Sequence, residues 1–217
     1  MTDFASMLQK PANGWPCTGC GERIDWPGVC DRCADAMARE RAKDMAQDAI
    51  STIPSRFRWA TFEAQELEAR AGCVDAARKA GRGLVRGNVR GILLVGLAGS
   101  GKTTLACALM RGMLTLPIGR TAKFAGALTL SRARADSGLG RTPALVDDAI
   151  RASLLVLDDL GQELHDDVIR EVVHARHDAD RPIIVTTGTP IDRFSDRYGA
   201  GTARRLTEGV QLVEVVR

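Results

Sequence analysis

A glycine-rich run is the first part of this chain whose residue types can do chemistry. It reads GLAGSGKT at residues 96–103, after the apolar residues 92–95 and before a helix-like segment that ends at Met113. Glycines let the backbone turn so that its N–H groups reach phosphate oxygens, and the start of the following helix adds positive partial charge. Lys102 supplies a mobile cation, and the Thr103 hydroxyl is a ligand for Mg²⁺. The strand-loop-helix setting disfavours an ordinary glycine-rich turn. We expect bound ATP to contact the following residues: Gly96, Leu97, Ala98, Gly99, Ser100, Gly101, Lys102, Thr103 and Thr104.

Two carboxylates follow a second apolar run. Residues 153–157 (SLLVL) lead directly into Asp158 and Asp159. A short run rich in Leu and Val is typical of a buried parallel strand, and ligands bind at the carboxyl ends of such strands. We expect Asp158 to hold Mg²⁺ and Asp159 to polarise the attacking water, so the pair favours hydrolysis of the nucleotide. The alternative for Asp159 is a cap on the next helix.

Four cysteines form two C-x-x-C pairs near the N-terminus. The pairs are Cys17/Cys20 and Cys30/Cys33, separated by nine residues. Four thiolates at such spacing can hold a tetrahedral Zn²⁺. The surrounding segment has few aliphatic residues, so the metal would contribute the folding free energy directly. Redox-active cysteines are the alternative, but neither pair has a βαβ pattern around it.

The composition is that of an ordinary globular protein, with 45% hydrophobic and 26% charged residues and a net charge of +3. No apolar run approaches the roughly 18–20 residues that cross a bilayer, and residues 1–10 lack a signal-peptide pattern. We therefore expect a cytoplasmic protein without a membrane partner. Residues 1–50 carry six Lys/Arg against eight Asp/Glu. Binding to phosphate backbones needs excess positive charge, so this segment is expected to bind protein.

Strands and helices are expected to alternate along most of the chain. The expected strands are 92–95, 121–125, 154–158, 182–187 and 210–216, and the expected helices are 34–50, 64–80, 104–113, 143–151 and 164–178. In the last helix, Leu164, Val168, Ile169, Val172 and Val173 share one face. The alternation predicts an α/β fold of the P-loop NTPase type, with a parallel sheet flanked by helices. We expect two domains, a zinc-binding module with a linker helix at 1–50 and an ATPase domain at 51–217.

Two basic segments each have two interpretations. The Gly/Arg-rich residues 81–91 are either a solvated turn or a contact with nucleotide or nucleic-acid phosphates. The stretch around Arg132, Arg134 and Arg141 is either an ordinary loop or a mobile basic loop that touches single-stranded DNA.

Several further patterns carry a family resemblance. They are IPSRFRWATF at 53–62, LDDLGQE at 157–163, RPIIVTT at 181–187, RYG at 197–199 and RL at 205–206. Together with the glycine-rich run they resemble the DnaC/IstB-like group of AAA+ ATPases, over residues 53–217. That group includes bacterial and phage loaders of replicative helicases and the ATPase helpers of some transposases.

The resemblance implies roles for residues that spacing alone does not assign. Thr187 resembles the residue that senses the γ-phosphate, although Gly188 stands where the family usually has Asn. Arg205 resembles the arginine finger given to a neighbouring subunit's ATP, with Arg204 as its nearest competitor. Arg217 resembles a second sensor arginine, and Glu163 matches a family acid. Twelve residues follow Arg205, too few for a helical lid.

On this resemblance we expect an ATP-dependent loader of a replicative DNA helicase. Its zinc module would dock on the helicase, while the AAA+ core binds and hydrolyses ATP, forms a homo-oligomer on ATP binding and contacts single-stranded DNA. The isolated monomer is expected to be a weak ATPase. The alternatives are an IstB-like transposition helper acting on duplex DNA and a non-hydrolysing adaptor switched by ATP.

Overall fold

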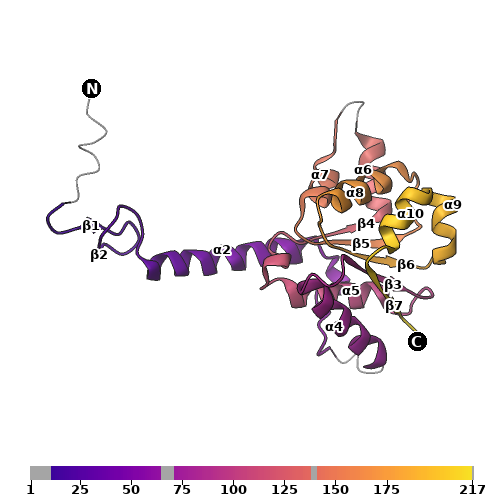
Figure 1. Ribbon diagram of the computed structural model, residues 1–217, viewed down its shortest axis with the longest axis horizontal. Helices are drawn as coiled ribbons and strands as arrows, with labels where there is room; N and C mark the ends of the chain where they lie inside the picture. The colour runs from indigo at the N-terminus through magenta and orange to yellow at the C-terminus, as the bar shows by residue number, and fades with distance from the viewer. Residues whose placement is uncertain (1–10, 65–70, 138–140, 217) are drawn as a thin grey trace. The chain divides into compact units, whose positions relative to one another are not determined.

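The computed structural model describes residues 11–64, 71–137 and 141–216, and it divides the chain into two compact units, Met1–Asp44 and Met45–Arg217 (Figure 1). The first unit contains a short antiparallel pair, β1 (Trp15–Pro16) with β2 (Arg23–Ile24). Helix α2 (Asp31–Thr52) runs across the boundary between the units. Its last turns belong to the second unit, where Ala49 is buried. None of the helices in the described ranges is long and apolar enough to cross a membrane.

The second unit is built on a parallel sheet of five strands in the order β4-β5-β6-β3-β7. The strands are β3 (Gly91–Val95), β4 (Lys123–Gly126), β5 (Leu155–Leu160), β6 (Ile183–Thr187) and β7 (Val210–Glu214). The helices are α4 (Ala71–Val85), α5 (Lys102–Met113), α6 (Ala127–Asp136), α7 (Ala144–Arg151), α8 (Asp167–Asp178), α9 (Phe194–Tyr198) and α10 (Ala200–Thr207). Short 3₁₀ turns lie at η1 (Ser55–Phe57), η2 (Pro117–Gly119) and η3 (Ile191–Arg193). The expected α/β fold with a parallel sheet is therefore confirmed.

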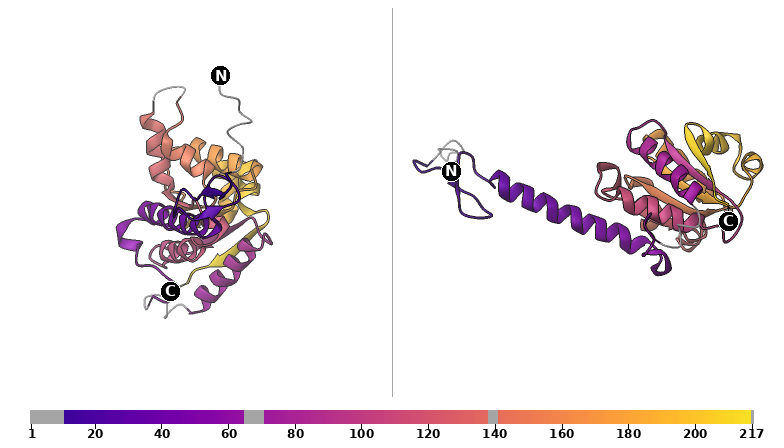
Figure 2. Two further views of the ribbon diagram at one scale, coloured as in Figure 1. Left: turned by 90° about the vertical axis from the view of Figure 1, so that its left-hand side faces the viewer. Right: turned by 90° about the horizontal axis from the view of Figure 1, so that it is seen from below.

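Each face of the sheet has its own apolar core. Alternate residues of β3 point to opposite faces, with Ile92 and Leu94 in one cluster and Leu93 in the other. Helices α4 and α5 cover the first face, and α6, α7, α8 and α10 cover the second, as both views in Figure 2 and the labels in Figure 1 show. This double covering explains why the strands are continuous apolar runs in the sequence.

Several elements differ from the expected ones, and three of the differences affect residues discussed above. Residues 65–70 of the expected helix 64–80 lie outside the described residues, and α4 continues through Gly81 and Gly83 to Val85, so residues 81–85 of the Gly/Arg-rich segment are helical. A Cβ on Gly81 would lie 3.0 Å from the Leu109 side chain, so the glycine allows α4 to pack closely on α5. Arg132 and Arg134 lie on helix α6 and not in a loop. Leu164 lies before α8 and is 61% exposed, so its expected place on the buried helix face was wrong.

Candidate nucleotide site and metal centre

The glycine-rich run forms the expected loop between β3 and α5. Gly99 and Gly101 have φ of 75° and 94°, a conformation that favours glycine. The turn brings the loop over the start of α5, whose first N–H groups have no partner within the helix. A cavity of about 380 Å³ lies beside the loop. It is lined by residues 95–98 and Ser100, and by residues 214–216 at and just after the end of β7.

Two polar groups of this loop suit a phosphate. The Lys102 side chain is 7% exposed, and its Nζ donates to the backbone oxygens of Gly96 and Leu97, each at 2.8 Å. Among the described residues no carboxylate pairs with this ammonium. The Ser100 Oγ is buried and has no hydrogen-bond partner in the described part of the chain. A buried cation and an unsatisfied hydroxyl both gain from an anionic ligand, so the loop's residues fit a nucleotide phosphate.

Asp158 lies between the loop and the neighbouring strand. Its Oδ1 accepts hydrogen bonds from the hydroxyls of Thr103, at 2.9 Å, and Thr186, at 2.7 Å. The pKa of Asp158 is raised, chiefly because burial disfavours its charged form. The hydrogen bond from Thr186 opposes this rise, the nearby Asp159 charge adds to it, and the Thr103 hydrogen bond and the Arg56 charge oppose it more weakly. This set of oxygen donors is the chemistry that Mg²⁺ prefers, so Thr103 and Asp158 are placed to hold it.

A bulge lifts Asp159 out of the sheet. The pairing of β5 with β6 shifts register between Leu157 and Leu160, and Asp159 has a φ of 54°. Its backbone N–H donates to Thr186 Oγ1 at 2.9 Å, which leaves the carboxylate exposed beside the buried Asp158. Bulges recur next to active sites because they redirect a side chain. Here the bulge separates the two acids into a buried and a solvent-facing position.

The structure gives Thr187 a different setting from its neighbour. Its hydroxyl donates to the Leu160 carbonyl at 2.7 Å and accepts from the Thr189 N–H at 2.9 Å, and the residue is fully buried. Thr186, which the sequence analysis did not assign, is the threonine of β6 that contacts both acids. Because strand neighbours point to opposite faces, a one-residue difference decides which hydroxyl reaches the site.

The arginines of α10 differ in exposure. The Arg205 side chain is 21% exposed, with Nη1 donating to the Gly201 carbonyl at 3.2 Å and Nη2 at 3.9 Å from Asp178. Arg204 is 63% exposed and lies 3.5 Å from Glu208, one turn along. Arg217 lies outside the described residues.

The four paired cysteines form a cluster in the first unit. The Sγ atoms of Cys17, Cys20, Cys30 and Cys33 all lie within 4.8 Å of one another. The Sγ atoms of Cys20 and Cys30 are 3.7 Å apart, close to the edge of about 3.8 Å expected for a tetrahedron with Zn–S bonds of about 2.3 Å. Donation from the Cys30 and Cys20 backbone lowers the pKa of Cys17 to about 6, whereas hydrogen bonds with the neighbouring cysteine side chains raise the pKa of Cys33 to about 12. A bound cation would favour the thiolate form of all four. The cluster therefore fits a structural zinc ion.

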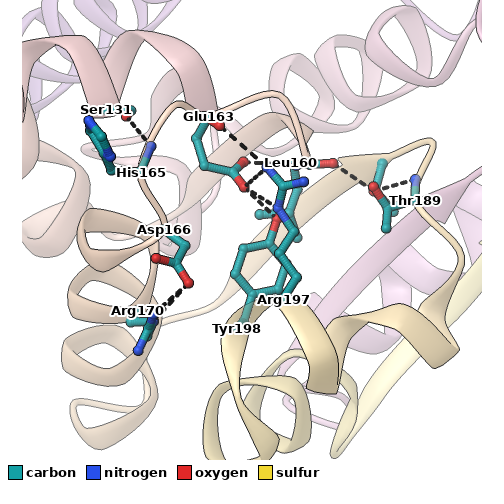
Figure 3. A network of polar contacts seen from close by, with 11 residues as sticks. Ser131, Leu160, Glu163, His165, Asp166, Arg170, Thr189, Arg197 and Tyr198 are labelled. Carbon is teal, nitrogen blue, oxygen red and sulfur yellow. Dashed lines mark hydrogen bonds and ion pairs between the residues drawn. The ribbon is translucent and has the colours of Figure 1, made fainter.

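Glu163 is the centre of a polar network that the sequence did not predict (Figure 3). Its side chain is fully buried, and Oε1 accepts from Arg197 Nε at 2.7 Å and from the Tyr198 hydroxyl at 2.8 Å. Its other oxygen, Oε2, accepts from the Gly161 N–H at 2.9 Å. The RYG pattern at 197–199 marked these partners only as part of a resemblance.

The basic segments are partly paired. Arg134 forms an ion pair with Glu171 of α8. In the Gly/Arg-rich segment, Arg90 forms an ion pair with Asp180. Arg82, Arg86 and Arg132 have no ion-pair partner within the described ranges, and Arg82, Arg86 and Arg141 are exposed. Surface arginines of this kind are compatible with either interpretation.

Comparison with known proteins places this geometry in a family. The sequence profile of the IstB-like ATP binding proteins matches residues 63–208. In contrast, no curated protein matches the chain.

The structure is similar to that of the DnaC helicase loader, with 22% identity, 75% of this chain and 100% of that chain covered, and a TM-score of 0.58. It is similar to DnaI at 19% identity, with 75% and 94% covered and a TM-score of 0.60. A third similar structure is a replication initiator DnaA bound to AMPPCP and single-stranded DNA, at 17% identity, with 76% and 51% covered and a TM-score of 0.56. At these identities the structures show the shared fold, while the profile covers more than half of the sequence. The chain therefore belongs to the family of IstB-like ATP binding proteins.

Proposed function

We propose that this protein is an ATPase that loads a replicative DNA helicase. The observation that carries the proposal is the contact between the two halves of the nucleotide site, in which Thr103 of the loop donates to Asp158 of β5 at 2.9 Å. A Cys₄ cluster on a separate unit gives the same chain a candidate docking module. The DnaC helicase loader and DnaI share the fold, which supports this assignment.

The residues of the site divide the chemistry among them. The loop N–H groups and Lys102 bind the β- and γ-phosphates, and they stabilise the charge that develops on them. Thr103 and Asp158 hold Mg²⁺, which neutralises phosphate charge when it is bound. The exposed carboxylate of Asp159 orients the attacking water, and the bulge turns it away from the buried position of Asp158. In this proposal Thr186 sets the positions of both acids.

The site is completed by a second copy of the chain. An arginine from α10 of a neighbouring subunit offsets transition-state charge, and Arg205 is the residue that the resemblance assigns. This dependence makes the isolated monomer a weak ATPase. It also couples hydrolysis to assembly, so that ATP turnover follows the binding of partner subunits, helicase or DNA.

The Cys₄ module binds the helicase and the ATPase unit binds single-stranded DNA. Residues 1–50 have two more acidic than basic residues, which disfavours binding to a phosphate backbone. Trp26 is 81% exposed and Val29 is 37% exposed in this module, so it presents apolar side chains to a protein partner. The ATPase unit, in contrast, carries exposed arginines that could contact a phosphate backbone: Arg82, Arg86 and Arg141.

The test is a co-purification with two full-length variants that fail in opposite ways. The double change Cys30→Ser and Cys33→Ser removes two zinc ligands, so it should abolish capture of the replicative helicase and leave ATP binding intact. Lys102→Ala should retain the helicase and lose ATP binding. Capture of the helicase at the wild-type level by the cysteine variant would refute the docking role.

A second candidate is a transposition helper, which the match to the IstB-like profile favours. Such a protein contacts a transposase and acts on duplex DNA. Gel shifts with ATP separate the two functions: a preference for single strands supports the loader, and a preference for duplex of equal length supports the helper. Asp159→Asn tests whether hydrolysis is used at all, because a non-hydrolysing adaptor keeps its full cellular function with this variant.

A further inference from the structure

Glu163 is a buried carboxylate that the proposed chemistry does not use. Its side chain has no exposed surface, and it accepts hydrogen bonds at both oxygens. Burying a charge is costly unless it is paired and hydrogen-bonded, and here the pairing partner, Arg197, is itself 40% exposed. The position of this costly group next to the bulge indicates a role in the nucleotide site.

One oxygen of Glu163 fixes the loop after Asp159. Oε2 accepts from the Gly161 N–H at 2.9 Å, and the Gln162 N–H donates to the Asp159 carbonyl at 3.1 Å. Gly161 has a φ of 108°, and a Cβ there would lie 2.3 Å from Thr189 Oγ1. The turn that carries Asp159 is thus held by Glu163, and it packs so closely against Thr189 that only a glycine fits at position 161.

The other oxygen holds helix α9. Oε1 accepts from Arg197 Nε and the Tyr198 hydroxyl, and Arg197 Nη2 also donates to the Glu163 carbonyl at 3.3 Å (Figure 3). Tyr198 is 1% exposed and packs edge to face on Phe194, so α9 is locked at this end. Gly199, with a φ of 78°, then joins α9 directly to α10, which carries Arg204 and Arg205.

We propose that Glu163 is a positioning residue that couples the Asp159 loop of one ATP site to helix α10. The coupling rests on the proposed function, since α10 supplies the arginine to a neighbouring subunit's ATP. The path runs along the chain from Asp159 through Leu160 to Gly161, then by a hydrogen bond of 2.9 Å to Glu163. From Glu163 it continues by hydrogen bonds of 2.7 Å to Arg197 and 2.8 Å to Tyr198, and Gly199 joins Tyr198 to α10. A change at Asp159 on nucleotide binding is thereby transmitted to the arginine offered to the next site.

The Glu163→Gln variant breaks this path with little change in volume. A glutamine has one acceptor oxygen and one NH₂ donor, whereas both oxygens of Glu163 accept from N–H or O–H groups. Whichever way the amide turns, its NH₂ faces the Gly161 N–H or the pair formed by Arg197 and Tyr198. Tyr198→Phe removes one donor only. Asp166→Asn is the matched control, because it makes the same charge change three residues away, at the ion pair with Arg170 on α8.

Hydrogen exchange of the full chain, with and without Mg²⁺ and a non-hydrolysable ATP analogue, tests the coupling. In the wild type and Asp166→Asn, the analogue should slow exchange of the amides in residues 96–104 and also in 194–207, the latter by about fivefold or more. In Glu163→Gln, protection should persist at 96–104 and be lost at 194–207, and Tyr198→Phe should reduce it. Thermal unfolding of each variant checks that it is folded.

Each remaining outcome has a definite meaning. Protection of 194–207 in Glu163→Gln equal to that in the wild type overturns the coupling. Wild-type protection confined to 96–104 also overturns it, but leaves the proposed ATP site standing. Absence of protection at both segments in the wild type refutes the proposed ATP site, and the coupling fails with it.

Discussion

Asp158→Asn should stabilise the protein while it disables the nucleotide site. Burial raises the pKa of Asp158 from its ordinary value of 3.8, with the adjacent Asp159 adding to the rise, so the charged form is disfavoured in the folded state. An asparagine retains the Oδ1 acceptor for Thr103 and Thr186 and removes the buried charge. The expected gain is about 0.5–2 kcal/mol, the usual size of a single stabilising change, or about 2–4 °C in Tm per kcal/mol for a unit of this size.

The pH dependence gives the sign of the effect. With a folded-state pKa above the unfolded value, the folded protein binds the Asp158 proton more tightly. Stability from this group is therefore lost as the pH rises from the unfolded pKa through the raised one. The advantage of Asp158→Asn should therefore grow as the pH rises above the unfolded pKa and shrink as the pH approaches about 4. Thermal unfolding followed by circular dichroism, without nucleotide or Mg²⁺, measures the gain in stability and its pH dependence.

The functional half of the prediction is tested by the ligand shift, which is the gain in unfolding free energy on binding Mg²⁺-ATP. Mg²⁺-ATP at about 100 times its Kd should stabilise the wild type by about 2.7 kcal/mol, and Asp158→Asn should lose most of that shift because a metal ligand is gone. Asp159→Asn is the matched control: its side chain is exposed and Asn tolerates a positive φ, so the ligand shift should change little. Its gain in stability should be smaller than that of Asp158→Asn, because it removes only the smaller charge contribution to the raised pKa of Asp158. A loss of more than about 1 kcal/mol in ligand-free Asp158→Asn near pH 7 would refute the reasoning, since it would mean that the charge itself stabilises the fold.

Three further predictions test other parts of the structure. Arg176→Ala should lower the free energy of unfolding, measured with urea, by about 3–5 kcal/mol. The reason is that the fully buried guanidinium donates to the carbonyls at the end of α7 and just before β6. A loss below about 1 kcal/mol would contradict this. Arg205→Ala should lower the ATPase rate of the assembled protein by about 10³-fold and leave monomer ATP affinity unchanged, whereas Arg204→Ala should change the rate only a few-fold; the reverse ranking would move the finger to Arg204. Chelation of zinc should unfold the first unit without lowering the Tm of the second unit, and the unfolding should change the fluorescence of Trp15 and Trp26. An unchanged fluorescence spectrum after verified metal removal would show that the cysteine module folds without metal.

Much of the fold was predictable because buried parallel strands produce a simple sequence signal. The strands at 92–95 and 182–187 are apolar runs since helices cover both faces of the sheet, and the structure confirms them as β3 and β6 with small changes at the ends. The helix predicted at 64–80 continues in the structure to Val85, past Gly81, a residue of low helix propensity. The close contact of Gly81 with Leu109 is a tertiary effect that these local preferences do not include.

The residues of the site that were missed are those whose role depends on register. Thr186 and Thr187 are identical in type and adjacent in sequence, yet only Thr186 faces Asp158, and the other hydroxyl is used by the Leu160 carbonyl. That choice follows from the pairing of β6 with β5 and from the bulge at residues 158–159, neither of which has a local sequence pattern. The bulge in turn needs a partner that holds its far end, and Glu163 supplies this by accepting from Gly161. A motif of the type LDDLGQE therefore joins two functions at fixed spacing: the acids that face the nucleotide, and the buried acid that fixes the turn on which the second of them stands. The same buried acid accepts hydrogen bonds from Arg197 and Tyr198, so the turn that carries Asp159 and helix α9 depend on one side chain.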